Sequence, residues 1–155
     1  MVTATIFEWA RQRRGAALVE FALVVILLLT IVLGIIEFGV IAMDQLTVTQ
    51  GAREGSRAAS LGRPVADIAA RVRGSAGLLE ENRIQVSMLY STDNGVSYPY
   101  TLGDRSGENN APPGSLVKIE CQYPHRMLTG DFFSWWSNVH NRELTLHTSV
   151  IMRRE

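Results

Sequence analysis

The residues able to do chemistry are few in this chain and match no catalytic motif. There is one cysteine, Cys121, and the three histidines His125, His140 and His147 have no spacing typical of metal ligands. No G-x-S-x-G motif, P-loop or G-x-G-x-x-G motif occurs. We therefore expect no enzyme, no catalytic residue, no metal site and no cofactor, and we place Cys121 on a buried strand.

The carboxylate of Glu20 is the exception, because it lies inside an apolar run. Residues 21–36 read FALVVILLLTIVLGII, and extending the run back to Ala16 adds Glu20 as its only charge. A carboxylate within a membrane costs a few kcal/mol and usually has a partner. Two interpretations stand on physical grounds: Glu20 snorkels to the nearby interface, or it pairs with another group as part of the function.

The apolar run is long enough to cross a bilayer, whose core of about 30 Å needs roughly 20 apolar residues at 1.5 Å per residue. The leader before it carries Arg11, Arg13 and Arg14, and basic residues beside a span stay cytoplasmic. The run is too long for a secretory signal peptide, and no small-residue cleavage site follows it. We expect a cytoplasmic leader over 1–15, a transmembrane helix over 16–43 and residues 44–155 on the far side.

The letters around Glu20 resemble a known processing signal. The leader ends as RQRRG, four residues follow Gly15, and Glu20-Phe21 then begins the apolar helix. This resembles the class III signal peptide of type IV pilins, which a prepilin peptidase cuts after the glycine. The fuller pattern, with IEFG at 36–39 and GAREGSR at 51–57, resembles the TadE-like family of minor pilins (pseudopilins) of the tight-adherence (Tad, Flp) type IV pilus. The segment 144–155 is similar to the family's closing strand.

The resemblance implies cleavage between Gly15 and Ala16, with Glu20 and Phe21 serving processing and assembly. Glu20 would neutralise the new α-amine of Ala16, on its own chain or on a neighbour. The implied partners are the prepilin peptidase, other minor and major pilins, the pilus assembly platform in the bacterial inner membrane, and membrane lipids. The domain after the span would then be periplasmic, and incorporation into the pilus stays open.

The helical pattern continues beyond the span. No proline occurs before Pro64, which predicts one helix over about 16–61. Apolar residues spaced by three and four predict a second helix over 65–79. Gly51 and Gly55 are interpreted as a notch that packs against the sheet, in preference to a dimer motif. Arginines 71, 73 and 83 make a basic face that is either solvated or in contact with an acidic partner or lipid head groups.

Alternating apolar residues predict strands over 83–90, 96–102, 116–123 and 144–152. Asn94-Gly95 predicts a tight turn between the first two strands, and Pro99 marks an edge strand. Residues 103–114 are predicted to be a polar loop. The expected fold class is α+β and pilin-like: a long N-terminal transmembrane helix continues into a domain with a second helix and an antiparallel sheet of about four strands.

Composition narrows the function classes. Fifteen Lys and Arg balance 15 Asp and Glu, so the chain lacks the basic excess of a nucleic-acid-binding protein. Three roles remain: a minor pilin, an uncleaved single-pass membrane-anchored accessory or sensory protein, and an anchored enzyme with an unrecognised site. The sequence favours the first and does not assign its position in a pilus.

An aromatic cluster interrupts the connection before the last strand. It consists of Phe132, Phe133, Trp135 and Trp136. Three interpretations stand open: the cluster covers the sheet or core, lies on the membrane interface where Trp is favoured, or forms a partner patch.

Overall fold

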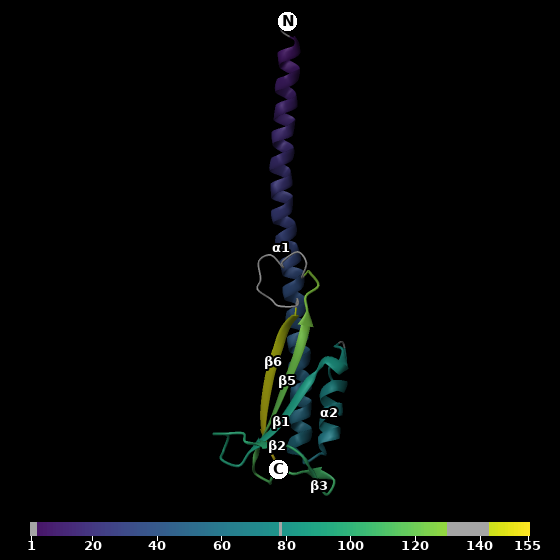
Figure 1. The fold of residues 1–155 in the computed structure, drawn as a ribbon, viewed down its shortest axis with the longest axis vertical. Coiled ribbons are helices and arrows are strands. Elements are labelled where there is room, and N and C mark those ends of the chain that lie inside the picture. Colours follow the sequence, from purple (N-terminus) through teal and green to yellow (C-terminus); the bar gives the residue numbers. More distant parts are fainter. Residues whose placement is uncertain (1–2, 78, 130–142) are drawn as a thin grey trace. The chain divides into compact units, whose positions relative to one another are not determined.

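The computed structural model describes residues 3–77, 79–129 and 143–155 (Figure 1). The aromatic cluster at 132–136 and His140 lie outside the described residues. The chain divides into two compact units, Met1–Gly39 and Val40–Glu155, and helix α1 (Thr3–Ser60) runs through both. Each unit is described by itself below.

Helix α1 confirms the predicted long helix and begins earlier, inside the basic leader. It ends where glycine and proline require it to end. Gly62 has a positive φ of 75°, its N–H donates to Ala59 O at 3.1 Å, and the N–H of Arg63 donates to Ala58 O at 3.1 Å. This is a Schellman motif, which satisfies the last carbonyls of the helix, and Pro64 prevents continuation.

Helix α2 (Val65–Gly74) is shorter than predicted. Its N-terminus is capped from a distance, because the N–H of Val65 donates to Asp104 Oδ1 at 2.7 Å. It ends at Gly74, because glycine is a poor helix former. Ala76 and Leu79, predicted to lie on this helix, are buried after its end, before the short 3₁₀-helix η1 (Glu81–Arg83).

The predicted antiparallel sheet of four strands is confirmed, in the order β2-β1-β5-β6. Its central strands are β1 (Gln85–Ser91) and β5 (Leu116–Arg126), and β6 (Glu143–Arg153) lies at one edge. Met88 of β1 pairs with Ile119 of β5. Alternate β5 residues are buried, so one face of the sheet carries the core.

The other edge strand, β2 (Tyr100–Thr101), is much shorter than the predicted strand over 96–102. The predicted turn is present, with positive φ at Asn94 and Gly95. Asp93 then holds the chain in the turn, since the N–H of Ser97 donates to its Oδ1 at 3.1 Å. Pairing with β1 therefore resumes only after Pro99, which has no N–H to donate.

The predicted polar loop over 103–114 contains a small hairpin of β3 (Asp104–Arg105) and β4 (Glu108–Asn109). Ser106 and Gly107, between the strands, both have positive φ, as a tight hairpin turn requires.

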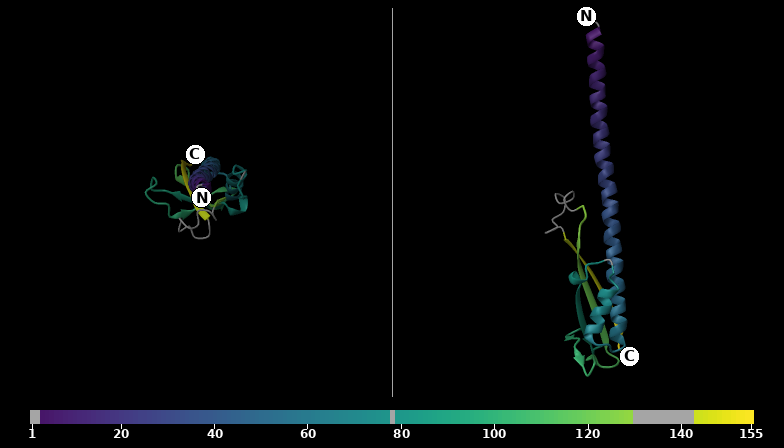
Figure 2. Two further views of the ribbon diagram at one scale, coloured as in Figure 1. Left: turned by 90° about the horizontal axis from the view of Figure 1, so that it is seen from above. Right: turned by 90° about the vertical axis from the view of Figure 1, so that its right-hand side faces the viewer.

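The core of unit Val40–Glu155 lies between the sheet and the two helices, which cover the same face of it (Figures 1 and 2). Gly51 and Gly55 form a notch on α1. The notch mainly receives α2, whereas the sequence predicted that it would pack against the sheet. A Cβ added at Gly51 would lie 2.8 Å from Val72 O, and one at Gly55 would lie 2.4 Å from Val72 Cγ2. Among the three atoms nearest to each added Cβ, one belongs to the sheet, on Ile119 at 3.7 Å from the Gly55 position. Without side chains at these two positions, α2 packs directly against α1.

Candidate processing and assembly site

The residues of the predicted cleavage site lie within helix α1. Gly15 and Ala16 are both helical and exposed, and the leader arginines at 11, 13 and 14 are in the same helix. A Cβ added at Gly15 would meet no atom within 4 Å, as is also true at Gly34 and Gly39. The packing of the described chain therefore does not require glycine at position 15, in contrast to Gly51 and Gly55.

Glu20 and Phe21 follow Ala16 at the start of the apolar segment, and both are exposed. In the part of the chain that the structure describes, the Glu20 carboxylate forms no hydrogen bond or ion pair. Residues four apart on a helix lie on one face, with Cβ atoms about 5–6 Å apart. Glu20 therefore lies one turn from Ala16, within reach of a charge placed there.

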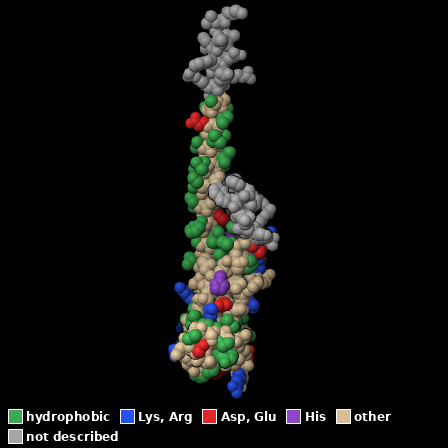
Figure 3. Space-filling model, turned by 60° about the vertical axis from the view of Figure 1, so that its left-hand side comes forward, with side chains coloured by type: hydrophobic (Ala, Val, Ile, Leu, Met, Phe, Trp, Pro, Cys, Tyr) green, Lys and Arg blue, Asp and Glu red, His purple; other side chains and the backbone are tan. Residues whose placement is uncertain are grey.

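The apolar segment of α1 presents its side chains outward. The leucines, isoleucines and phenylalanine from Leu18 to Ile36 are exposed except for the half-buried Leu33, and Phe21 keeps 66% of its surface accessible. Figure 3 shows this helix with hydrophobic side chains along its visible face. Among the described helices, α1 alone is long and apolar enough to cross a membrane. A bare helix of this kind suits a single-pass membrane anchor.

The GAREGSR segment at 51–57 separates small buried residues from charged exposed ones. Ala52 and Ser56 are fully buried, and the Ser56 hydroxyl donates to Ala52 O at 2.8 Å and lies 3.3 Å from Val150 O on β6. Arg53, Glu54 and Arg57 point outward. The small residues thus attach α1 to the sheet and α2, and the charged residues are left for solvent or a partner.

Sequence analysis missed a buried polar pair. The Nδ1 atom of His125 on β5 lies 2.7 Å from Oδ2 of Asp44 on α1, and the His125 side chain is 3% exposed. These residues are 81 positions apart, and neither carries a local signal of pairing. The pair fixes the register of α1 against the end of the sheet.

A second missed group joins the C-terminus to the end of α1. Arg154 donates from Nη2 to Glu108 Oε2 at 2.7 Å and from Nη1 to Asn109 O at 2.8 Å. The Asn109 amide donates to Ala59 O at 2.9 Å, and the N–H of Glu155 donates to Ser60 O at 3.0 Å. The terminal residues and the β3–β4 hairpin thus complete the cap of α1.

The contacts described above do not bring together metal-ligating or nucleophilic side chains of the described residues. Within residues 3–77, 79–129 and 143–155, no three His, Cys, Asp or Glu side chains are placed to hold a metal ion. Cys121 is buried on β5 as predicted, and desolvation raises the pKa of its thiol to about 11. A thiol with so high a pKa is protonated at neutral pH and is a poor nucleophile.

Comparison with known proteins agrees with the features of α1. A family model described as TadE-like protein matches residues 15–57, from Gly15 through Glu20 to the end of GAREGSR. No curated protein and no solved structure matches the chain. The family is a structural, pilus-associated one and not a family of enzymes. Over residues 15–57 the chain is similar to the TadE-like family, in agreement with the resemblance in its sequence.

Proposed function

We propose that this protein is a minor pilin (pseudopilin) that assists assembly of a Tad/Flp type IV pilus after a prepilin peptidase cleaves it between Gly15 and Ala16. The observation that carries the proposal is the carboxylate of Glu20, which has no partner among the described residues and lies one turn after Ala16 at the start of a bare apolar helix. The family match over residues 15–57 supports a role in the Tad pilus.

The surroundings of Gly15 support cleavage there. Glycine costs about 1 kcal/mol relative to alanine inside a helix. At Gly15 no neighbour in the described chain explains that cost, because the space around its α-carbon is open. A peptidase that accepts only a small residue before the cut bond would explain it. Glycine also makes this turn of α1 easier to unwind into an active site.

Cleavage would give Glu20 a partner that the described chain does not supply. The new α-amine of Ala16 is cationic at neutral pH, and Glu20 lies four residues along the same helix. In a bundle of pilin helices, the amine of one subunit and the carboxylate of another would neutralise each other within low dielectric. Removal of the leader would also remove the arginines that hold the helix in the membrane. The subunit would then be free to move from the inner membrane into a pilus.

The proposal is tested by intact-mass analysis of the protein extracted from membranes. In a strain with an active prepilin peptidase, we expect a chain that begins at Ala16. Gly15→Val should block cleavage and leave the full-length chain. The matched control is Gly34→Val, which places the same side chain in open space on the same helix and should leave processing unchanged.

Uncut wild-type protein in the presence of active peptidase would overturn the proposal. It would instead favour an uncleaved membrane-anchored accessory or sensory protein. Processing of Gly15→Val at the wild-type rate would also contradict the assigned cleavage site.

A further inference from the structure

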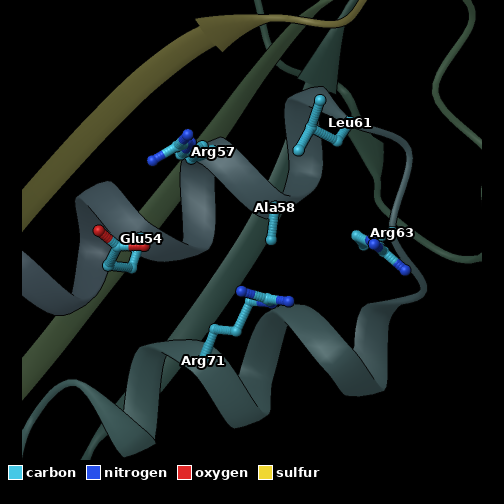
Figure 4. Close-up of a pocket in the computed structure, with 6 residues that line it drawn as sticks. All are labelled: Glu54, Arg57, Ala58, Leu61, Arg63 and Arg71. Carbon is cyan, nitrogen blue, oxygen red and sulfur yellow. The ribbon is translucent and has the colours of Figure 1, made fainter.

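A hollow between α1 and α2 carries an uncompensated positive charge that the proposed cleavage and docking do not use. It lies in unit Val40–Glu155 and has a volume of about 320 Å³. Its lining residues, labelled in Figure 4, are Glu54, Arg57, Ala58, Leu61, Arg63 and Arg71. The lining thus includes three guanidinium groups and one carboxylate.

The three arginines have no internal partners. Within the described chain, the side chains of Arg57, Arg63 and Arg71 form no hydrogen bond and no ion pair. Other arginines of this unit are paired, since Arg83 donates to Glu143 at 2.8 Å and Arg154 donates to Glu108 at 2.7 Å. Arg53 and Arg73 also lack a partner in the described chain, so what distinguishes this hollow is that three such arginines line it together.

The carboxylates that line this hollow and the adjoining one form no ion pair with its arginines. Glu54 lines it but lies beyond ion-pair distance of any described arginine. Glu108 lines an adjoining hollow that shares Leu61 and Arg63, but its carboxylate is bonded to Arg154. Arg57 on α1, Arg71 on α2 and Arg63 in the connection between the helices carry like charges that repel one another, and an anion between them would relieve that repulsion.

The chemistry of the lining identifies the anion. Guanidinium groups bind carboxylates and phosphates through paired N–H donors. The carboxylate of Glu54 would repel a doubly charged phosphate more than a singly charged carboxylate. Leu61, which is 55% exposed, offers apolar surface to the methylene groups of a side chain.

We propose that this hollow docks an Asp or Glu side chain from an acidic segment of a partner protein. A membrane surface fits less well. At 1.5 Å per residue, Arg57 lies about 25 Å along α1 from Val40, where this unit begins. The Debye length at physiological ionic strength is about 8 Å, so lipid head groups near Val40 would be screened from Arg57. The proposal does not depend on cleavage at Gly15.

The test measures binding of a fluorescently labelled hexaglutamate peptide to the uncut full-length protein in a neutral detergent. The whole chain has no net charge, so binding of a polyanion reports a local site and not general attraction. Wild type should bind the peptide, and Arg63→Gln/Arg71→Gln should weaken binding at least about tenfold. The matched control is Arg73→Gln, which removes an exposed arginine of α2 outside the hollow and should change affinity less than about twofold.

Circular dichroism and thermal unfolding verify that each variant remains folded. Absence of peptide binding to wild type would overturn the proposal, as would equal loss in the Arg73 control and the double variant. Parallel measurements use inorganic phosphate and vesicles containing phosphatidylglycerol. Binding to the vesicles but not to the peptide would assign the hollow to a lipid surface instead. Failure here leaves the intact-mass result unaffected, so the two proposals fail separately.

Discussion

His125 on β5 and Asp44 on α1 form a polar contact of 2.7 Å in which the imidazole is almost fully buried. The contact joins the end of the sheet to the first part of α1 in unit Val40–Glu155. Cys121 and Tyr123, near His125 on β5, are buried in the hydrophobic core. The His125–Asp44 pair therefore adds a polar contact of defined geometry to packing that is otherwise apolar.

Asp44→Ala should destabilise the domain by about 1–3 kcal/mol, because it removes the acceptor that faces Nδ1 of a buried His125. Urea unfolding of the full-length protein in detergent, followed by circular dichroism, measures the change. The control is Gln50→Ala, an exposed position on the same helix, for which we expect a change within about 0.5 kcal/mol. Equal stability of Asp44→Ala and wild type would show that the contact contributes nothing.

The notch at Gly55 gives a second prediction. Gly55→Ala should destabilise by about 1–3 kcal/mol, because the new Cβ would lie 2.4 Å from Val72 Cγ2. Val72→Ala removes that methyl group, so the double variant should be more stable than the sum of the single effects by at least about 0.5 kcal/mol. The measurement is the same urea unfolding.

Gly74→Ala is the matched control for the notch. A Cβ at Gly74 meets no atom within 4 Å, and the residue is helical, so alanine should be neutral or should stabilise by up to about 1 kcal/mol. If Gly55→Ala behaved like Gly74→Ala, the close approach of α2 to α1 would be wrong.

The buried thiol gives a prediction about pH. Burial raises the pKa of Cys121 from 9.0 to about 11, so the unfolded thiol ionises at lower pH than the folded one. The stability of the domain should therefore fall as pH rises above about 9.

At pH 8 a thiol reagent should label native protein slowly and should label it completely in guanidinium chloride. Because the chain has one cysteine, the label count is unambiguous. Rapid stoichiometric labelling of native protein would contradict burial of Cys121.

Topology is predicted from the basic leader and the apolar segment. With Arg11, Arg13 and Arg14 cytoplasmic, residues 44–155 should lie in the periplasm. A C-terminal alkaline phosphatase fusion should be active, because that enzyme needs disulfides that form only in an oxidising compartment. A fusion truncated within the leader serves as the inactive control. A full-length fusion that is stable and abundant but inactive would reverse the orientation.

Local sequence patterns predicted the helices and strands, but they did not predict the contacts between residues far apart in the chain. The long α1 helix follows from an apolar run without proline, and the four strands follow from alternation. The pairing of Asp44 with His125 and of Arg154 with Glu108 depends on how those elements meet, which no spacing encodes. The length of β2 was also not predictable from alternation, because the side chain of Asp93 binds the backbone of the turn in competition with strand pairing.

The candidate site divides in the same way. Gly15 and Glu20 could be proposed from the sequence because a processing signal is a local pattern, and their roles stay predictions. The basic hollow was only partly predictable. The sequence placed Arg71 on a basic face of the second helix, whereas Arg57 and Arg63 line the hollow only because α2 packs against α1. Arg83, assigned from sequence to the same basic face, is instead paired with Glu143.

Glu20→Gln tests the docking role proposed for this carboxylate. Because Glu20 forms no contact within the described chain, its replacement should leave the membrane level and the processing of the protein near normal. If Glu20 pairs with the Ala16 amine of a neighbouring subunit, the variant should crosslink less to partner pilins in intact membranes and should reduce piliation. Loss of a charge pair in low dielectric predicts a decrease of at least about tenfold in association.

The matched control is Glu81→Gln, which makes the same change at an exposed position of η1 and should leave crosslinking unchanged. Processing is followed on the same gel, because an uncut subunit would also fail to assemble and would imitate a docking defect. A free carboxylate near the interface snorkels at modest cost, and its loss would change neither crosslinking nor piliation. Normal crosslinking with normal pili in Glu20→Gln would therefore favour the snorkelling interpretation. Reduced crosslinking of a fully processed subunit would favour pairing between neighbours.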